Sequence, residues 1–178
     1  MTLPLATISD EVLVATDEVV RLDARAIDLV RDRASRVSRG RARICMHKSA
    51  TDSLHEMLIA ITATSYIRPH RHHARAESFH LVEGAADVVL LRDDGEIDDV
   101  VPLSATANFY YRLDTPRYHT LVVRTEIVVV HEITLGPFVP EESNGAPFAP
   151  AEGDPAAVMY KEELARRVGK WRQLHGLH

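Results

Sequence analysis

The sequence has little cysteine and few aromatic residues: Cys45 stands alone, and Phe, Trp and Tyr together make up 6% of 178 residues. A single cysteine excludes an internal disulfide and any site built on several thiolates, and it favours a reducing compartment. No apolar run approaches the roughly 20 residues that a membrane-spanning helix needs. The N-terminus also lacks the features of a signal peptide. We therefore expect a cytoplasmic protein without a membrane partner.

Basic residues do not gather into a tract, and the formal net charge is -5. Nucleic-acid binding requires clustered Lys and Arg that neutralise phosphates, so we expect no nucleic-acid partner. Apolar residues make up 46% of the chain and charged residues 26%, which is typical of a globular protein. The length allows one well-buried core, which predicts a single domain with terminal additions.

Helical periodicity appears near the N-terminus, over residues 17–37. Apolar residues recur there at steps of three and four, acidic residues stand at the start, and Gly40 is placed to end the helix. One apolar stripe opposite a charged face predicts a helix that packs on something larger. We expect residues 1–40 to form an arm and an amphipathic helix on the core.

The C-terminal part of the chain, residues 137–178, is rich in proline and then turns helical. Asp154-Pro155 is a good helix start, and Tyr160, Leu164 and Val168 fall on one helical face. We expect an extended segment followed by a short helix, which Trp171 would anchor.

Residues 41–136 are typical of a β structure, with short β-rich segments separated by turn signals and no helical pattern between them. This organisation predicts an all-β core, an antiparallel sandwich or barrel, rather than a βαβ fold. The predicted strands include 58–61, 79–82, 87–91, 109–111, 121–123 and 127–130, and the predicted turns are 83–84, 93–95 and 125–126.

A histidine-rich run lies at the start of this β region. His70 and His72 are separated by one residue, so on an extended segment both rings point to the same face, whereas His73 points to the other. A third imidazole and a carboxylate such as Glu77 would complete a ligand set that suits Fe, Mn, Zn or Ni. The spacing predicts one divalent metal ion per chain, with room left on the ion for a substrate. The alternative is that these are solvated surface histidines.

The run matches the first cupin motif, Gly-x5-His-x-His-x3-4-Glu-x6-Gly, at His70, His72, Glu77 and Gly84, with Thr64 in place of the leading glycine. The second cupin motif is weaker but retains its histidine, His119. The chain thus resembles the cupin superfamily. The resemblance implies a double-stranded β-helix, or jelly-roll, barrel with His70, His72, Glu77 and His119 as metal ligands, and a homodimer.

Within the cupin superfamily, the segments that flank the motifs resemble those of the WbuC-type cupin metalloproteins. That family is associated with bacterial surface-polysaccharide gene clusters, which implies a small-molecule ligand such as a sugar, sugar acid or nucleotide-sugar. The segments that carry the resemblance are 41–47, 66–72, 90–95, 132–138 and 148–153.

Further polar residues are candidates to contact a substrate or to support the metal ligands. Arg41, Arg43 and His47 alternate along one predicted strand, where they would either bind a carboxylate or phosphate or blunt a solvated edge strand. Of His131 and Glu132, which alternate on the last strand, one must point inward, and the sequence leaves open which. The other candidates are Arg68, Tyr66, Tyr111 and Tyr118.

Three functions are compatible with such a site. The first is a metalloenzyme with isomerase, epimerase, lyase or dioxygenase chemistry. The second is a non-catalytic module in which metal and arginines hold a sugar or an anion, and the third is a barrel that the metal only stabilises. An open coordination position favours the first two. The sequence identifies no catalytic acid–base pair, and the enzyme is our preferred hypothesis.

Overall fold

Two β-sheets and two helices make up the protein, whose structure is a computed structural model that describes residues 3–73, 75–139 and 143–177. The larger sheet has the strand order β1-β2-β3-β4-β11-β6-β9, and the smaller β12-β5-β10-β7-β8. In the larger sheet the strands are β1 Leu5–Thr7, β2 Val12–Ala15, β3 Arg41–Cys45, β4 Leu54–Thr62, β6 Glu77–Glu83, β9 Tyr110–Leu113 and β11 Ile127–Leu135. In the smaller they are β5 His70–His72, β7 Ala86–Leu91, β8 Ile97–Leu103, β10 Tyr118–Val123 and β12 Ser143–Gly145.

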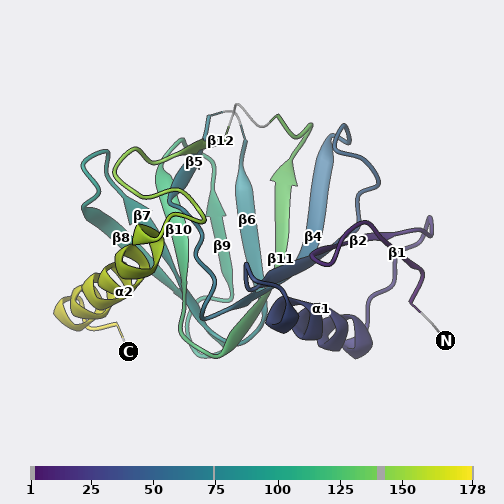
Figure 1. Ribbon diagram of the computed structural model, residues 1–178, viewed down its shortest axis with the longest axis horizontal. Coiled ribbons are helices and arrows are strands. Elements are labelled where there is room, and N and C mark those ends of the chain that lie inside the picture. The colour runs from purple at the N-terminus through teal and green to yellow at the C-terminus, as the bar shows by residue number, and fades with distance from the viewer. Residues whose placement is uncertain (1–2, 74, 140–142, 178) are drawn as a thin grey trace.

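The chain passes back and forth between the two sheets as it does in a jelly roll. From β4 to β11, the strands form the orders β4-β11-β6-β9 in one sheet and β5-β10-β7-β8 in the other, with antiparallel neighbours throughout. Each neighbouring pair except β7–β8 therefore joins strands that are distant in sequence, which is the double winding of this fold. The predicted double-stranded β-helix is confirmed (Figure 1).

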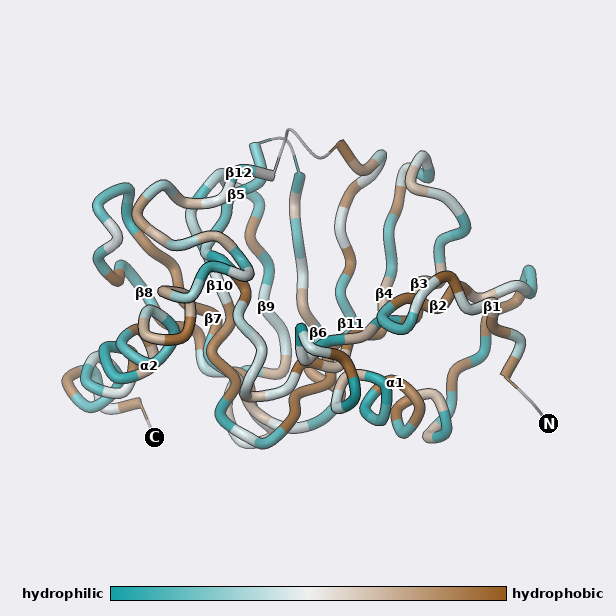
Figure 2. Tube along the Cα trace, in the orientation of Figure 1, coloured by the Kyte–Doolittle hydropathy of each residue, from teal (hydrophilic) through white to brown (hydrophobic). Residues whose placement is uncertain are grey.

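Strand β7 is buried on both of its faces. Val88 and Leu90 point into the core between the sheets, while Val89 and Leu91 point outward, and all are buried. The outer side is covered by helix α2, Ala156–Leu174, which contributes Leu164 and Val168. A strand covered on both faces needs apolar residues at every position, which explains the uninterrupted Val-Val-Leu-Leu sequence. In Figure 2 this strand is largely brown, the colour of hydrophobic residues.

Helix α1, Ala24–Arg36, packs its apolar stripe on the larger sheet. Ala26, Val30 and Ala34 are fully buried against β3, β4 and β11. The helix begins at Asp23, whose carboxylate accepts a hydrogen bond from the Arg25 backbone N–H at 3.0 Å. The predicted start at residue 17 is wrong, because the side chain that caps the first turn lies six residues later.

Helix α2 spans 19 residues, so the prediction of a short C-terminal helix is also wrong. Its predicted apolar face does contact the barrel, and Trp171 is partly buried there. Near its end the buried Arg172 guanidinium donates to the Asp87 carboxylate of β7, which Arg124 also approaches at 3.3 Å. This ion pair joins the helix to the outer face of the smaller sheet.

Strands β1 and β2, in the N-terminal arm, have no counterpart in the sequence prediction. Strand β2 lies parallel to β3, and β4 lies antiparallel on the other side. Strand β3 is therefore an interior strand, and the alternative that its arginines blunt a sheet edge is wrong. Among the described residues, no helix is both long and apolar enough to cross a membrane.

Candidate metal centre

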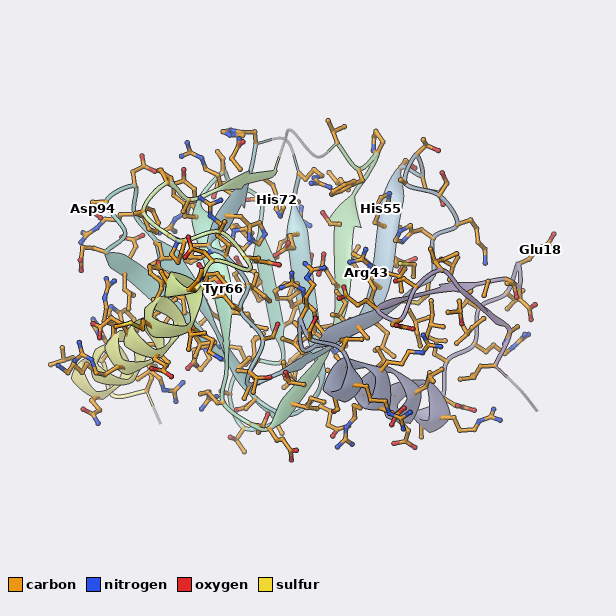
Figure 3. All side chains as sticks on the ribbon, in the orientation of Figure 1. Glu18, Arg43, His55, Tyr66, His72 and Asp94 are labelled. Atoms are coloured by element: carbon orange, nitrogen blue, oxygen red, sulfur yellow. The ribbon has the colours of Figure 1, made fainter. Side chains whose placement is uncertain are left out.

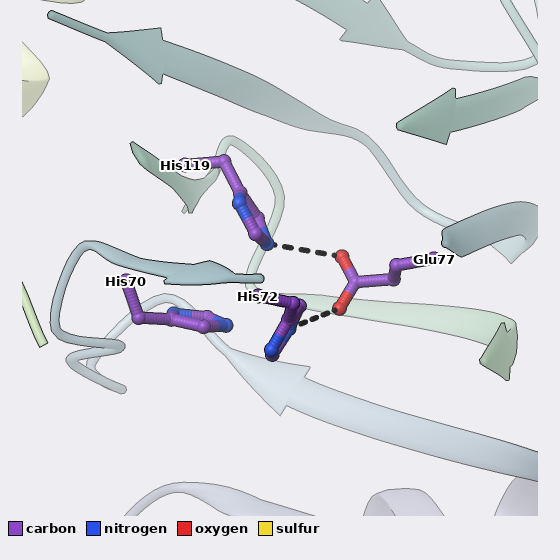
Figure 4. Close-up of side chains that lie close together, drawn as sticks. All are labelled: His70, His72, Glu77 and His119. Carbon is purple, nitrogen blue, oxygen red and sulfur yellow. Dashed lines mark hydrogen bonds and ion pairs between the residues drawn. The ribbon is translucent and has the colours of Figure 1, made fainter. Parts of the chain in front are cut away.

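The four predicted ligands come from three neighbouring strands at one end of the barrel. His70 and His72 alternate on β5, His119 is the cross-strand partner of His70 on β10, and Glu77 begins β6 in the facing sheet. One ligand atom from each of the four lies within 4.8 Å of the others. Figure 4 shows the three imidazoles and the carboxylate converging on one point.

Backbone contacts fix the orientation of two of the imidazole rings. The Nδ1 atoms of His70 and His119 lie 3.0 Å from the carbonyl oxygens of Arg68 and Arg117, respectively. A carbonyl oxygen only accepts hydrogen bonds, so each Nδ1 carries the proton and each Nε2 keeps a free lone pair. This tautomer is the one that ligates through Nε2, with the carbonyl in the supporting role that metal-bound histidines usually have.

Electrostatics hold the site in a form ready for a cation. Burial would raise the pKa of Glu77, but the imidazoles of His119, His72 and His70 more than offset this and keep its pKa well below the usual range. Burial, followed by repulsion from His119, lowers the pKa of His70 to about 4. Burial also acts to lower the pKa of His119, yet the Glu77 carboxylate raises it above the ordinary value. The carboxylate is thus ionised and His70 neutral at neutral pH.

The residues present fit a divalent metal ion. Glu77 Oε1 and His119 Nε2 are both buried without a hydrogen-bond partner, although they lie only 3.3 Å apart. Glu77 Oε2 lies 3.2 Å from His72 Nε2. Orphaned buried polar atoms are costly unless something binds them, and these are aimed at one another. Three neutral nitrogens and one carboxylate are a donor set that Fe(II), Mn(II), Zn(II) and Ni(II) accept.

The remaining histidines near the motif lie elsewhere. His73 is exposed, as strand alternation predicts. His80 is also exposed, on the outer side of β6, where its ring packs against Phe109 at 5.6 Å between centroids.

A cavity of about 780 Å³ opens beside the four ligands. Its floor is the inner face of the larger sheet, on which side chains form regular cross-strand rows. Glu77 lies opposite Thr134, which lies opposite His55; in the next row Phe79 lies opposite Glu132. The cavity volume lies in the range of small-molecule sites.

Several of the candidate substrate residues do line this cavity. They include Arg41, Arg43, His47 and Arg68. Arg41 is already paired with Glu152, and Arg68 donates to the Ala146 carbonyl at 2.7 Å.

His47 and His55 form a stacked pair in the cavity wall. Their ring centroids lie 4.1 Å apart and the rings are nearly parallel. His47 Nδ1 also accepts a hydrogen bond from the Glu56 backbone N–H at 3.2 Å. These contacts give the two rings a structural role at the side of the cavity formed by β3 and β4.

The tyrosines predicted near the site do not line the cavity. The Tyr66 hydroxyl donates to the Pro150 carbonyl at 2.9 Å, and Figure 3 shows this residue beside α2, apart from Arg43 and His55. Tyr111 packs on Phe79, and burial, reinforced by the Glu77 charge, raises its pKa. Tyr118 packs on Phe148 in the outer layer. Tyr66 and Tyr118 thus lie outside the lining of the cavity, while Tyr111 supports its wall from behind.

The structure decides between His131 and Glu132. Glu132 lines the cavity. His131 points to the opposite face of the sheet, where its Nε2 lies 3.8 Å from Glu56 Oε1. Burial, followed by repulsion from Glu77, raises the pKa of Glu132 to about 8, although Arg43 and Arg75 act in the opposite sense. Among the described residues, no hydrogen bond or ion pair reaches the Glu132 carboxyl group.

The cavity residues that the sequence analysis did not single out include Arg75, His55 and Phe138. Alternation from Glu77 could have identified Arg75, which lies two residues before it and therefore faces the same side. His55 and Phe138 carried no such signal, because the sheet register that brings them to the cavity is not visible in sequence.

Comparisons with known proteins support the fold and leave the activity open. Residues 22–103 match a family model described as a domain of unknown function, DUF6016. No curated protein sequence matches this chain. The WbuC-type resemblance thus stays a prediction.

Among solved structures, a protein from Shewanella oneidensis superposes with a TM-score of 0.53 at 11% sequence identity, covering 74% of this chain and 87% of that one. A double-stranded β-helix protein from Klebsiella pneumoniae gives a TM-score of 0.48 at 14% identity, covering 62% of this chain and 89% of the other. A cupin superfamily protein from Desulfitobacterium hafniense gives 0.43 at 12%, covering 53% and 76%. At 11% identity the similarity to the Shewanella protein concerns the fold alone.

Proposed function

We propose that this protein is a metal-dependent enzyme that acts on a small polar metabolite in the cavity beside His70, His72, Glu77 and His119. One observation carries the proposal: the Glu132 carboxyl group shares that cavity and has no protein partner among the described residues. Glu132 is half-buried in the cavity wall, and a carboxyl group withdrawn from water without a hydrogen-bond partner is costly to keep. An acid–base role next to the metal centre accounts for it.

A bound divalent ion would supply Lewis-acid polarisation of a substrate oxygen, or a site for O2. The chain itself supplies the rest. His70 and His119 are held by backbone carbonyls, so the coordinating face is preorganised. Glu132 would accept or donate a proton at a substrate carbon or hydroxyl, and burial raises its pKa toward the neutral range in which such a transfer operates.

For the substrate we propose a sugar, a sugar acid or a nucleotide-sugar linked to surface-polysaccharide metabolism, as the WbuC-type resemblance implies. The cavity volume and its mixture of apolar and polar walls support a ligand of that size. Isomerisation, epimerisation and elimination all begin with removal of a proton beside a polarised oxygen, which the ligand set and Glu132 together would serve. Dioxygenation would use the open positions differently and would not require Glu132.

The experiment that tests this proposal is metal analysis of untagged protein, followed by turnover assays. We expect about one divalent ion per chain. Incubation of sugar acids and nucleotide-sugars in ²H₂O should lead to deuterium incorporation beside a carbonyl, which NMR detects, and Glu132→Gln should abolish incorporation while retaining the metal. Oxygen uptake without deuterium incorporation would instead identify a dioxygenase.

Two outcomes would contradict the enzyme. Metal far below one ion per chain would remove its basis. Full metal occupancy with ligand binding but no conversion would favour the alternative, a non-catalytic module that holds a sugar or an anion. The cytoplasmic location and the homodimer stay proposals that rest on the single cysteine and on the cupin resemblance.

A further inference from the structure

The cavity has charged groups at both ends, with the metal centre at one end and Arg43 toward the other. Glu132 pairs with Met57 on β4, and Met57 pairs with Cys45 on β3. Arg43 lies two residues before Cys45 on that strand and faces the same side of the sheet. Strand spacing and rise place the Cα atoms of Arg43 and Glu132 about 12 Å apart. Glu77 and Glu132 are closer, about 8 Å apart as diagonal neighbours. A ligand of a few carbon atoms would span the space between the metal centre and the Arg43 guanidinium.

Most of the basic side chains that line the cavity already have partners. Arg39 and Arg41 both pair with Glu152, at 2.9 and 2.6 Å. Lys48 Nζ donates to the carbonyl oxygens of Ala15 and Asp17. Because these cations already contact carboxylate or carbonyl oxygens of the protein, they are less available to a ligand.

Arg43 differs from these residues. In the part of the chain that the structure describes, no carboxylate forms an ion pair with its guanidinium, although the side chain lines the cavity. Glu132 faces the same space but lies too far away to pair with it. A guanidinium presents five donors in a planar fork that matches a carboxylate or phosphate group.

A second cation lies nearer the metal centre. Arg75 is buried, its guanidinium lies over the Phe138 ring at 5.2 Å, and its charge acts on Glu132. Overall, six basic and four acidic side chains line the cavity. A divalent ion would make the interior still more positive, which favours an anionic ligand over a neutral one.

We infer that the cavity binds a small organic anion, whose carboxylate or phosphate group pairs with Arg43 and whose other end reaches the metal centre past Glu132. The inference rests on the proposed function, and it narrows the substrate class to acids. The Arg43 side chain is exposed and hydrogen-bonds the Cys45 thiol, so a neutral sugar would leave its positive charge without a negative charge to pair with. An acid would satisfy Arg43 and fill the space between the two ends.

Three achiral probes test this inference by isothermal titration calorimetry on the metal-loaded protein: glutarate, 3-phosphonopropionate and glutaramide. We expect at least one of the two anions to bind about tenfold or more tightly than the neutral diamide, because hydrogen bonds to a charged group are stronger than those to a neutral amide. Glutarate and 3-phosphonopropionate share one carboxylate, so a difference between them reports whether exchanging the second carboxylate for a phosphonate strengthens binding, and the Arg43→Gln variant shows whether Arg43 contributes to that difference.

Arg43→Gln should weaken binding of the tighter anion by about tenfold or more and leave the metal content unchanged. Arg112→Gln is the matched control, since Arg112 is an exposed arginine on the outer side of β9, and it should change neither. If Arg43→Gln does not fold, Arg43→Lys should fold and bind more weakly than the wild type, because it keeps the charge and loses the fork.

Equal affinity for glutaramide, undiminished affinity in the Arg43→Gln variant, or no binding of either anion in the millimolar range would overturn the inference. Metal content distinguishes this failure from that of the proposed function. A protein with full metal that ignores both anions refutes only the anion site, whereas a protein without metal refutes the enzyme.

Discussion

Glu77 and Glu132 are diagonal neighbours on the inner face of the larger sheet: Glu77 lies opposite Thr134 on β11, and Glu132 is two residues from Thr134 on that strand. The two carboxyl groups have opposite electrostatic surroundings. Imidazoles keep Glu77 ionised, whereas burial and the Glu77 charge raise the pKa of Glu132 to about 8. One carboxylate is thus suited to bind a cation and the other to transfer a proton, an assignment made by environment alone.

The first prediction concerns the ligands. His70→Ala should reduce metal content from about one ion per chain to a small fraction, because one of four donors and its backbone-fixed orientation are lost. His73→Ala, three residues away on the exposed side, is the control and should retain the metal. Inductively coupled plasma mass spectrometry of both proteins measures this difference. Equal metal content in the two variants would refute the site.

The second prediction concerns the pH dependence of metal affinity. The pKa of His119 is raised above the ordinary 6.5 by Glu77, so protons compete for its Nε2 already near neutral pH. His70, with a pKa of about 4, competes with protons only in stronger acid. Affinity measured with a competing chelator should therefore fall steadily as the pH is lowered from 8 to 5. Unchanged affinity down to pH 5 would contradict these ligands.

The third prediction concerns the stability of the metal-free protein. The carboxyl group of Glu132 has a pKa of about 8 when folded, against 4.5 as the ordinary value. Below pH 4.5 both states are protonated; as the pH rises toward 8 only the unfolded state releases the proton, so unfolding becomes more favourable. Glu132→Gln does not titrate and should gain stability relative to the wild type across this interval.

Urea unfolding at several pH values measures that difference, with Glu126→Gln, at an exposed turn, as the control. The gain should be absent near pH 4 and reach its maximum above pH 8. A constant difference between Glu132→Gln and wild type at all pH values would show that Glu132 titrates normally.

The fourth prediction concerns the ion pair between α2 and the smaller sheet. Arg172→Met should reduce the free energy of unfolding by about 3–5 kcal/mol, because it leaves the buried Asp87 carboxylate with only Arg124. Arg166→Met breaks an exposed pair with Glu163 on the same helix and should lower the free energy of unfolding far less than Arg172→Met does. Thermal or urea denaturation compares the two, and similar costs would show that burial does not govern the Asp87 pair.

Local sequence patterns were sufficient for the β-rich core and for the candidate ligands His70, His72 and Glu77, and the cupin resemblance added His119. Alternation identified the strands and the shared face of His70 and His72, and the motif added Glu77, Gly84 and His119. Gly84 adopts a φ of +83° at the turn between β6 and β7, which a side chain would strain. Such features depend on neighbours in the chain, and they are therefore visible in sequence.

Features that depend on long-range pairing were missed or wrong. The start of α1 was placed too early because the capping Asp23 competes with earlier acidic residues that look equally suitable. Strand β3 was allowed to be an edge, since nothing in residues 41–45 reveals that β2 lies beside it. Tyr66 was placed near the site because sequence proximity to His70 does not show that its hydroxyl faces Pro150.

The sequence by itself determined the all-β core and the spacing of the candidate ligands His70, His72 and Glu77, because strand alternation and ligand spacing are local properties, whereas the jelly-roll winding and His119 came from the cupin resemblance. Only the tertiary structure decided what lies beside the ligands. Register between β4, β11 and β6 turns Glu132 inward and His131 outward, and it places Arg43 in the same cavity. Those relationships arise from strands far apart in the chain, whose pairing is set by packing of the whole core.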